Sequence, residues 1–173
     1  MKRLQKISVI VIYFISVVPL FLMAQNNPND YLKVHNDARA SVRVQPLKWD
    51  SMLEKYARDY VNKHAVNCTA RKHYHQKHTR IVERYPEFIT GAEAVTNWVK
   101  TKLNYHYPSN SCVDGKIFSC IRYVQIVWSA TTHLGCARIN CHHNKKDVLI
   151  SCYYYPSHNF PAERPYVLLE LPI

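Results

Sequence analysis

Apolar residues recur at helical spacing near the start of the chain. Asn27 is a capping residue and Pro28 suits a first helical turn. Apolar side chains follow at intervals of three or four, namely Tyr31, Val34, Ala38 and Val42. This spacing predicts a first helix that ends by 44–46.

Two further stretches have a helix-start signal followed by one apolar face. Ser51 and Glu54 have the spacing of a capping box, and the face that follows comprises Leu53, Tyr56, Ala57, Tyr60, Val61 and His64. Thr90 and Glu93 repeat the capping box, and the face that follows contains Val95, Trp98, Val99 and Leu103. We therefore expect a second helix that ends before Asn67 and a third that starts at Gly91.

Three short runs are rich in β-branched and aromatic residues, which predicts consecutive antiparallel strands. They are Tyr123–Trp128, Leu134–Ile139 and Val148–Tyr155. The basic stretch Cys68–Tyr85 fits no period, and we expect a surface loop there with at most a short helix at Thr79–Arg84. A second loop, closed by cysteines, is expected at Asn104–Phe118, and four prolines keep the tail beyond Tyr155 out of any central strand.

The N-terminus predicts secretion. A basic start precedes an apolar run at Ile7–Met23, and small Ala24 is followed by polar residues, as in a signal peptide cleaved after Ala24. The alternative is an uncut membrane anchor. Cleavage would remove Lys2, Arg3 and Lys6 and lower the formal charge from +11 to +8. The remaining basic balance favours an anionic partner, such as acidic polysaccharide or phospholipid headgroups, and no nucleic-acid motif accompanies it.

All six cysteines follow the predicted signal peptide: Cys68, Cys112, Cys120, Cys136, Cys141 and Cys152. An even number in an exported chain predicts three disulfides, although spacing alone leaves their connectivity open. The chain contains no Cys-x-x-Cys pair, which argues against a zinc ribbon or a thioredoxin-like site.

Several segments together resemble the plant pathogenesis-related protein 1 family, within the superfamily that includes cysteine-rich secretory proteins and venom antigen 5. The matching segments are Asn27–Tyr31, Val34–Arg39, Pro46–Asp50, Asn104–Tyr105, Ser109–Cys112, Gln125–Trp128, Leu134–Arg138, Asn159 and Arg164–Tyr166. The resemblance covers residues 25–166, leaving a signal peptide at 1–24 and an apolar tail at 167–173.

The resemblance implies an α+β fold, a three-layer α-β-α sandwich around a three-stranded antiparallel sheet. It also implies three disulfide pairs: Cys68 with Cys141, Cys112 with Cys120, and Cys136 with Cys152.

Relatives in this superfamily have a cleft with two histidines and two acidic residues that hold a divalent metal. The corresponding positions in this chain are Lys72, Thr79, Thr101 and Arg122. Two cations and two hydroxyls supply no anionic ligand, so we expect neither a metal nor a catalytic residue there. Arg122 is expected to fill the space and to hydrogen-bond to Thr101 or a carbonyl, with anion binding as the alternative.

Four further features are candidate sites. His73, His75 and His78 resemble a zinc or copper cluster, but their basic neighbours favour a solvated loop. Tyr105, Tyr107 and Phe118 lie in the region that some relatives use to bind sterols, although half-buried tyrosines packed on the sheet are the favoured interpretation. Asn67 begins the only Asn-x-Ser/Thr glycosylation sequon. Tyr155–Pro156 resembles the bond at which some relatives release a defence-signalling peptide, although a structural C-terminal arm is the favoured interpretation.

Together these features favour a secreted, monomeric, non-enzymatic defence or stress protein of the plant cell wall or apoplast. We expect it to bind sterol, other lipid or an acidic surface, with no cofactor. A precursor of a peptide that begins at Pro156 is the alternative, and a metal-dependent hydrolase is the least favoured one.

Overall fold

The computed structural model describes residues 26–68 and 79–168, and the His73, His75 and His78 cluster and Lys72 lie outside these ranges. The main sheet has the strand order β1-β5-β6-β2. Its strands are β1 (Lys48–Trp49), β2 (Thr79–Pro86), β5 (His133–Asn140) and β6 (Asp147–Tyr155). β5, β6 and β2 pair antiparallel, as expected for the family, and the short β1 adds to β5 in parallel.

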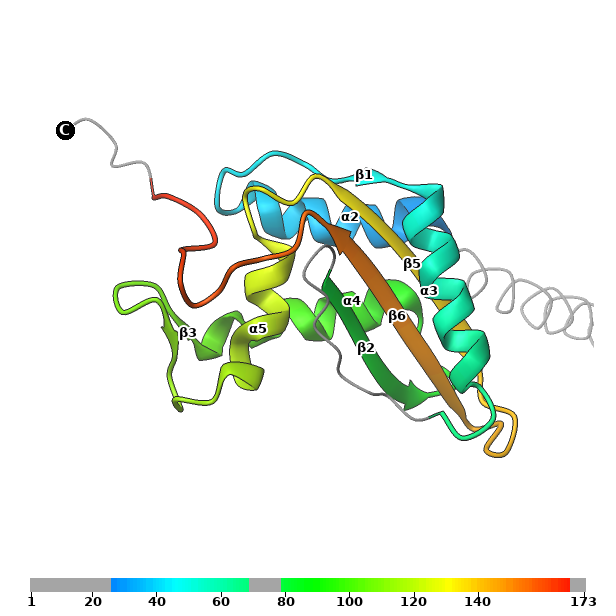
Figure 1. Ribbon diagram of the computed structural model, residues 1–173. Helices are drawn as coiled ribbons and strands as arrows, with labels where there is room; N and C mark the ends of the chain where they lie inside the picture. Colours follow the sequence, from blue (N-terminus) through cyan, green and yellow to red (C-terminus); the bar gives the residue numbers. More distant parts are fainter. Residues whose placement is uncertain (1–25, 69–78, 169–173) are drawn as a thin grey trace, which may run out of the picture.

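Helices cover both faces of this sheet (Figure 1). They are α2 (Pro28–Ala40), α3 (Ser51–His64), α4 (Gly91–Lys100) and α5 (Ile117–Ile126), with a 3₁₀ turn η1 (Thr101–Asn104). A small hairpin of β3 (Tyr105–His106) and β4 (Ser111–Cys112) precedes α5. No helix of the described ranges is long and apolar enough to cross a membrane.

Alternate residues of β6 enter two hydrophobic clusters, one on each side of the sheet. Ile150 and Tyr154 pack with residues of α2, α4 and α5 such as Trp98. Leu149, which points to the other face, packs with Val61 of α3. This alternation follows from the two-residue repeat of a strand and confirms the α-β-α sandwich.

Local capping signals predicted two helix starts correctly and placed a third one residue late. Asn27 and Asp30 form the capping box of α2, and Thr90 and Glu93 form that of α4. The N-cap of α3 is Asp50, whose Oδ1 accepts hydrogen bonds from the backbone N–H groups of Met52 and Leu53. A carboxylate is as good a cap as a serine hydroxyl, so Asp50 caps the helix in place of Ser51.

The predicted strand at Tyr123–Trp128 is wrong, because this segment forms the end of α5 and the turn after it. Its residues are buried nearly all around, so the apolar run has no polar face that would mark a helix. The predicted loop or short helix at Thr79–Arg84 is also wrong, since Thr79–Pro86 is strand β2. The arginines of this strand make its sequence look like a polar loop. In the structure they have partners on β6, since Arg80 donates to the Tyr153 hydroxyl and Arg84 pairs with Asp147.

All three disulfides that the resemblance implied are present: Cys68–Cys141, Cys112–Cys120 and Cys136–Cys152. The first joins the end of α3 to the end of β5, and the second joins β4 to α5. In the chain-entropy model, the loop of 73 residues closed by the first contributes about 4 kcal/mol.

Arg39 of α2 fixes α5 and the loop after it in place. The side chain is fully buried, and four carbonyl oxygens accept its hydrogen bonds. They belong to Gln45 (2.6 Å), Ile126 (2.9 Å), Trp128 (2.8 Å) and Thr131 (2.9 Å). Two of them lie at or just beyond the carboxyl end of α5, where a helix favours positive charge.

Candidate functional site

Three of the four family cleft positions are described, and they lie on three different elements. Thr79 is the first residue of β2 and is buried. Thr101 follows α4, where its hydroxyl donates to the Trp98 carbonyl and accepts from the backbone N–H of Tyr123. The Thr101 hydroxyl therefore links α4 to α5 and is not free to bind a ligand.

Arg122 pairs with a carboxylate that the sequence did not lead us to expect. Its Nη2 lies 2.7 Å from Oε1 of Glu83 on β2, and about three quarters of each side chain is buried. Arg122 also donates weakly to the Phe118 carbonyl, at 3.4 Å, while Thr101 is not its partner. The loop expected at Cys68–Tyr85 does not predict Glu83 as a partner, whereas the alternation of Thr79, Ile81 and Glu83 is the pattern of one strand face.

The second oxygen of Glu83 is also fully engaged. Oε2 accepts hydrogen bonds from the Tyr85 hydroxyl at 2.6 Å and from the Trp98 indole N–H at 2.8 Å. Burial raises the pKa of Tyr85 well above its usual value, and the adjacent carboxylate raises it further. Glu83 thus accepts hydrogen bonds from three side chains, and both of its carboxylate oxygens are engaged.

This network does not fit a divalent metal. A metal needs free deprotonated ligands, and here a guanidinium occupies the position beside the carboxylate. In the part of the chain that the structure describes, no three His, Cys, Asp or Glu side chains gather closely enough to hold a metal ion.

Three exposed apolar residues lie on the segments that meet at η1, β4 and α5, and we call the surface formed by these segments the apolar tip. Leu103, Val113 and Phe118 are 85%, 69% and 46% exposed. Two hydrogen bonds hold these segments together: Val113 N–H to the Asn104 carbonyl at 2.9 Å, and the Asn104 amide to the Ser119 carbonyl at 3.1 Å. The tip belongs to a lobe that projects beyond the end of the sheet (Figure 1).

Basic residues border the apolar tip. Two of them are exposed lysines: Lys102 directly precedes Leu103, and Lys116 lies two residues before Phe118. Asp114 is the acidic residue of this lobe, and its carboxylate accepts hydrogen bonds from the Ser119 hydroxyl and the Lys116 backbone N–H. These two bonds, the first being the larger cause, hold the pKa of Asp114 below its usual value.

Tyr105 and Tyr107, the other two sterol candidates, are half-buried under the C-terminal arm. The Tyr105 hydroxyl donates to the side chain of Asn110 at 2.9 Å. The Tyr107 ring stacks on Tyr166, and its hydroxyl donates to the Tyr166 carbonyl at 3.2 Å. Of the three proposed sterol contacts, Phe118 is thus the exposed one.

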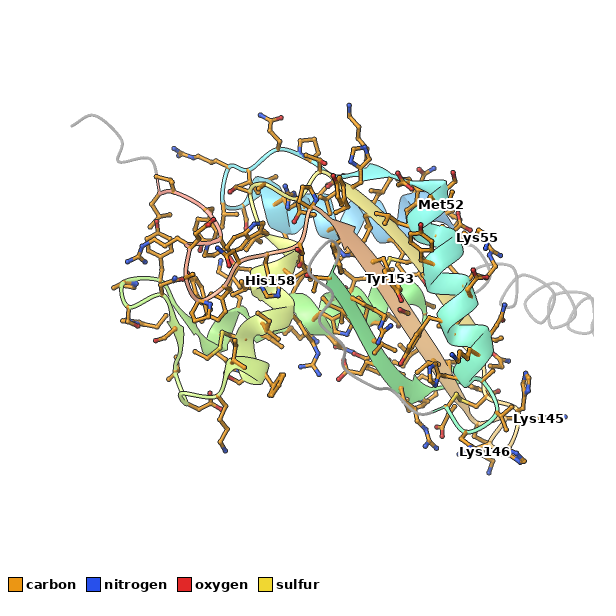
Figure 2. All side chains as sticks on the ribbon, in the orientation of Figure 1. Met52, Lys55, Lys145, Lys146, Tyr153 and His158 are labelled. Atoms are coloured by element: carbon orange, nitrogen blue, oxygen red, sulfur yellow. A yellow bond between two sulfur atoms is a disulfide. The ribbon has the colours of Figure 1, made fainter. Side chains whose placement is uncertain are left out.

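The candidate peptide-release bond lies in a firmly held segment. The Tyr155 carbonyl accepts from the backbone N–H of Thr132, and the Pro156 carbonyl accepts from the Thr131 hydroxyl, both at 2.9 Å. Further along the arm, the Asn110 amide donates to the carbonyls of Pro161 and Glu163. Figure 2 shows His158 in this arm beside α5, and its ring contacts Trp128 edge-on.

The glycosylation candidate Asn67 is exposed just after α3, one residue before the disulfide-bonded Cys68. The Thr69 that completes its sequon lies outside the described ranges.

Comparison with known proteins agrees with these observations. The model of the cysteine-rich secretory protein family matches residues 32–154. Pathogenesis-related protein 1A of Nicotiana tabacum is 38% identical over 158 residues, which cover 88% of this chain and 92% of that protein. Pathogenesis-related leaf protein 4 of Solanum lycopersicum is 42% identical over 143 residues, covering 83% and 86%. Among solved structures, venom allergen-like protein 4 of Schistosoma mansoni has a TM-score of 0.66 at 23% identity and covers 82% of this chain and 94% of its own.

Proposed function

Because the chain belongs to the cysteine-rich secretory protein family, in its pathogenesis-related protein 1 group, we propose that it is a secreted defence or stress protein that binds an anionic lipid surface and has no catalytic activity. Its place of action is the extracellular space of the plant, at the cell wall or apoplast. Three disulfides support this location, since such bonds persist in oxidising compartments.

The hydrogen bonds made by the described residues of the family cleft favour binding over catalysis. General acid-base or metal chemistry needs a group that can reach a substrate and change its protonation or coordination. The carboxylate of Glu83 accepts hydrogen bonds from Arg122, Tyr85 and Trp98. The hydroxyl of Thr101 is hydrogen-bonded to the backbone carbonyl of Trp98 and the backbone N–H of Tyr123. These groups hold the fold together and leave no reactive side chain at the family positions that the structure describes.

The apolar tip is the observation that carries the lipid proposal. Soluble proteins rarely expose several large apolar side chains side by side, and such patches mark contact surfaces. Leu103 and Phe118 would enter the boundary between headgroups and acyl chains, while Lys102 and Lys116 would meet anionic headgroups. Full burial of an exposed Leu or Phe side chain is worth roughly 1.5–3 kcal/mol, and Phe118, which is already half-buried, would contribute about half of that, so the two together suffice for measurable attachment.

Vesicle co-sedimentation tests this proposal. We expect the protein to sediment with vesicles that contain phosphatidylserine, less with vesicles of phosphatidylcholine alone, and less at high salt. The double variant Leu103→Ser/Phe118→Ser should reduce binding at least about tenfold, a loss of 1.4 kcal/mol.

The matched control removes two apolar side chains elsewhere, in the variant Val66→Ser/Phe88→Ser, and should bind like the parent protein. Equal loss in both double variants, or no binding by the parent, would refute the proposal. Adding sterol to phosphatidylcholine vesicles separates the two lipid chemistries. If sterol alone restores full binding, the proposed role of the lysines is wrong.

A further inference from the structure

Exposed basic side chains come from two neighbouring segments at one end of the sandwich, and we call this surface the basic end. The segments are the last turn of α3 and the loop between β5 and β6. The exposed basic residues are Lys63, His142, His143, Lys145 and Lys146. Figure 2 shows Lys145 and Lys146 at the end of the molecule opposite the lobe that carries the apolar tip in Figure 1.

The two segments of the basic end are joined to each other. The longest-range disulfide links the chain just after α3 to the start of the β5–β6 loop. Two backbone hydrogen bonds lie beside it: His142 N–H to the Ala65 carbonyl at 2.9 Å, and His143 N–H to the Val66 carbonyl at 3.3 Å. The backbone that carries the basic side chains is therefore held in place, so that a partner need not order it on binding.

Asn144 and Asp147 fix the loop and leave its lysines without a carboxylate. The Asn144 carbonyl accepts from the backbone N–H of Asp147 at 3.0 Å, and the Asn144 Oδ1 accepts from that of Lys146 at 3.3 Å. The carboxylate of Asp147 accepts from the Asn144 amide at 2.6 Å and from Nε of Arg84 at 2.8 Å. Arg84, and not a lysine of the loop, is thus the cation that Asp147 neutralises.

The three lysines of the basic end have no ion pair among the described residues. Asp59 lies one turn before Lys63 on α3, but its carboxylate pairs with Lys55 at 2.7 Å. Glu87 is an exposed acidic neighbour, since its backbone N–H donates to the Lys146 carbonyl at 2.8 Å. One neighbouring carboxylate against three ammonium groups leaves an excess of positive charge, and the two imidazoles add hydrogen-bonding groups.

Charges that are spread over two segments favour a partner with many anionic groups. A single exposed pair of an ammonium and a carboxylate contributes little, because both ions are well hydrated and salt screens them. A polyanion engages several lysines at once, so that weak contacts act together, and it releases condensed counterions. An acidic polysaccharide is the polyanion that a protein at the cell wall would meet, and this choice rests on the extracellular role proposed above.

We propose that the basic end binds an acidic polysaccharide, whose carboxylates face Lys63, Lys145 and Lys146. The basic end shares no residue with the apolar tip and lies at the other end of the molecule. One molecule therefore has separate surfaces for a polysaccharide and for a lipid surface.

Calorimetric titration with polygalacturonate at low salt tests the basic end, and the methyl-esterified polymer is the uncharged probe with the same backbone. We expect polygalacturonate to bind, less tightly as salt is raised, and the ester to bind much more weakly. A lysine near an anionic surface contributes about fivefold in affinity, so Lys145→Gln/Lys146→Gln should weaken binding at least about tenfold. The matched control, Arg43→Gln/Lys48→Gln, removes two exposed cations elsewhere and should bind like the parent protein.

Vesicle co-sedimentation separates this proposal from the lipid proposal. Lys145→Gln/Lys146→Gln should sediment with phosphatidylserine vesicles as the control variant does, and Leu103→Ser/Phe118→Ser should bind polygalacturonate like the parent protein. Each double variant removes one activity, so the failure of either proposal is distinguishable from that of the other.

Three results would overturn the role of the basic end. They are equal affinity for the methyl-esterified polymer, equal loss of polygalacturonate binding in the lysine variant and its control, and tighter binding of double-stranded DNA than of polygalacturonate at the same salt concentration. The last result would assign the surface to a different polyanion.

Discussion

Replacing Arg39 by methionine should be among the most destabilising single changes in this protein. Methionine fills much of the same apolar volume but leaves the carbonyls of Gln45, Ile126, Trp128 and Thr131 without their donor. Four hydrogen bonds to a charged group, at about 1.5 kcal/mol each, give a loss of roughly 6 kcal/mol. Burial lowers the pKa of Arg39 to about 10, which reflects the cost of desolvating its charge. Relief of that cost should reduce the net loss to about 4 kcal/mol.

Urea unfolding of the protein with its disulfides intact measures this loss as a shift of the midpoint at constant slope. Arg39→Lys keeps the charge but cannot reach all four carbonyls, so its loss should be intermediate. Arg43→Gln, at an exposed position, should stay within about 0.5 kcal/mol of the parent. A loss below about 1 kcal/mol in Arg39→Met would show that water satisfies these carbonyls, and the proposed anchoring of α5 would be wrong.

Three further predictions concern a buried histidine of α2, the ion pair of Arg122 and the C-terminal arm. His35 is fully buried, its Nδ1–H donates to the Tyr31 carbonyl, and burial lowers its pKa from 6.5 to about 4. Because the unfolded chain binds the proton more readily, the free energy of unfolding should fall by up to about 3 kcal/mol as pH drops from 6.5 to 4, and this group should change it no further below pH 4. The urea midpoint should therefore vary less with pH in His35→Gln than in the parent protein. An equal pH dependence of the midpoint in both proteins would contradict the assignment. Glu83→Gln and Arg122→Gln should each cost about 1 kcal/mol, and a double-mutant cycle should show coupling between them; additivity would mean that the ion pair contributes nothing. In limited proteolysis, Asn110→Ala should speed cleavage in the C-terminal arm at constant global stability, since its amide holds the Pro161 and Glu163 carbonyls; an unaltered rate would show that the arm is held by other contacts.

Features that depend on neighbours in sequence could be predicted from the chain alone. The caps at Asn27 and Thr90 are set by side chains three residues away, so both helix starts were correct. The disulfide pairs came from the family resemblance, because spacing alone permits many connectivities.

Features that depend on distant partners could not be predicted. The segment Tyr123–Trp128 is buried on all sides, and a fully buried helix has no polar stripe to distinguish it from a strand. Arg122 and Glu83 are separated by 39 residues in sequence and meet only because β2 lies beside α5.

The edge strand β2 affects how the protein behaves at high concentration. A strand with only one neighbour can recruit another chain and grow into a multi-chain sheet. Within the described sheet β2 is such a strand, yet it carries Arg80, Glu83 and Arg84 and terminates in Pro86. A second molecule docking there would have to strip water from the exposed charge of Arg84 and would find no N–H on the proline. This composition should keep concentrated solutions free of fibrils.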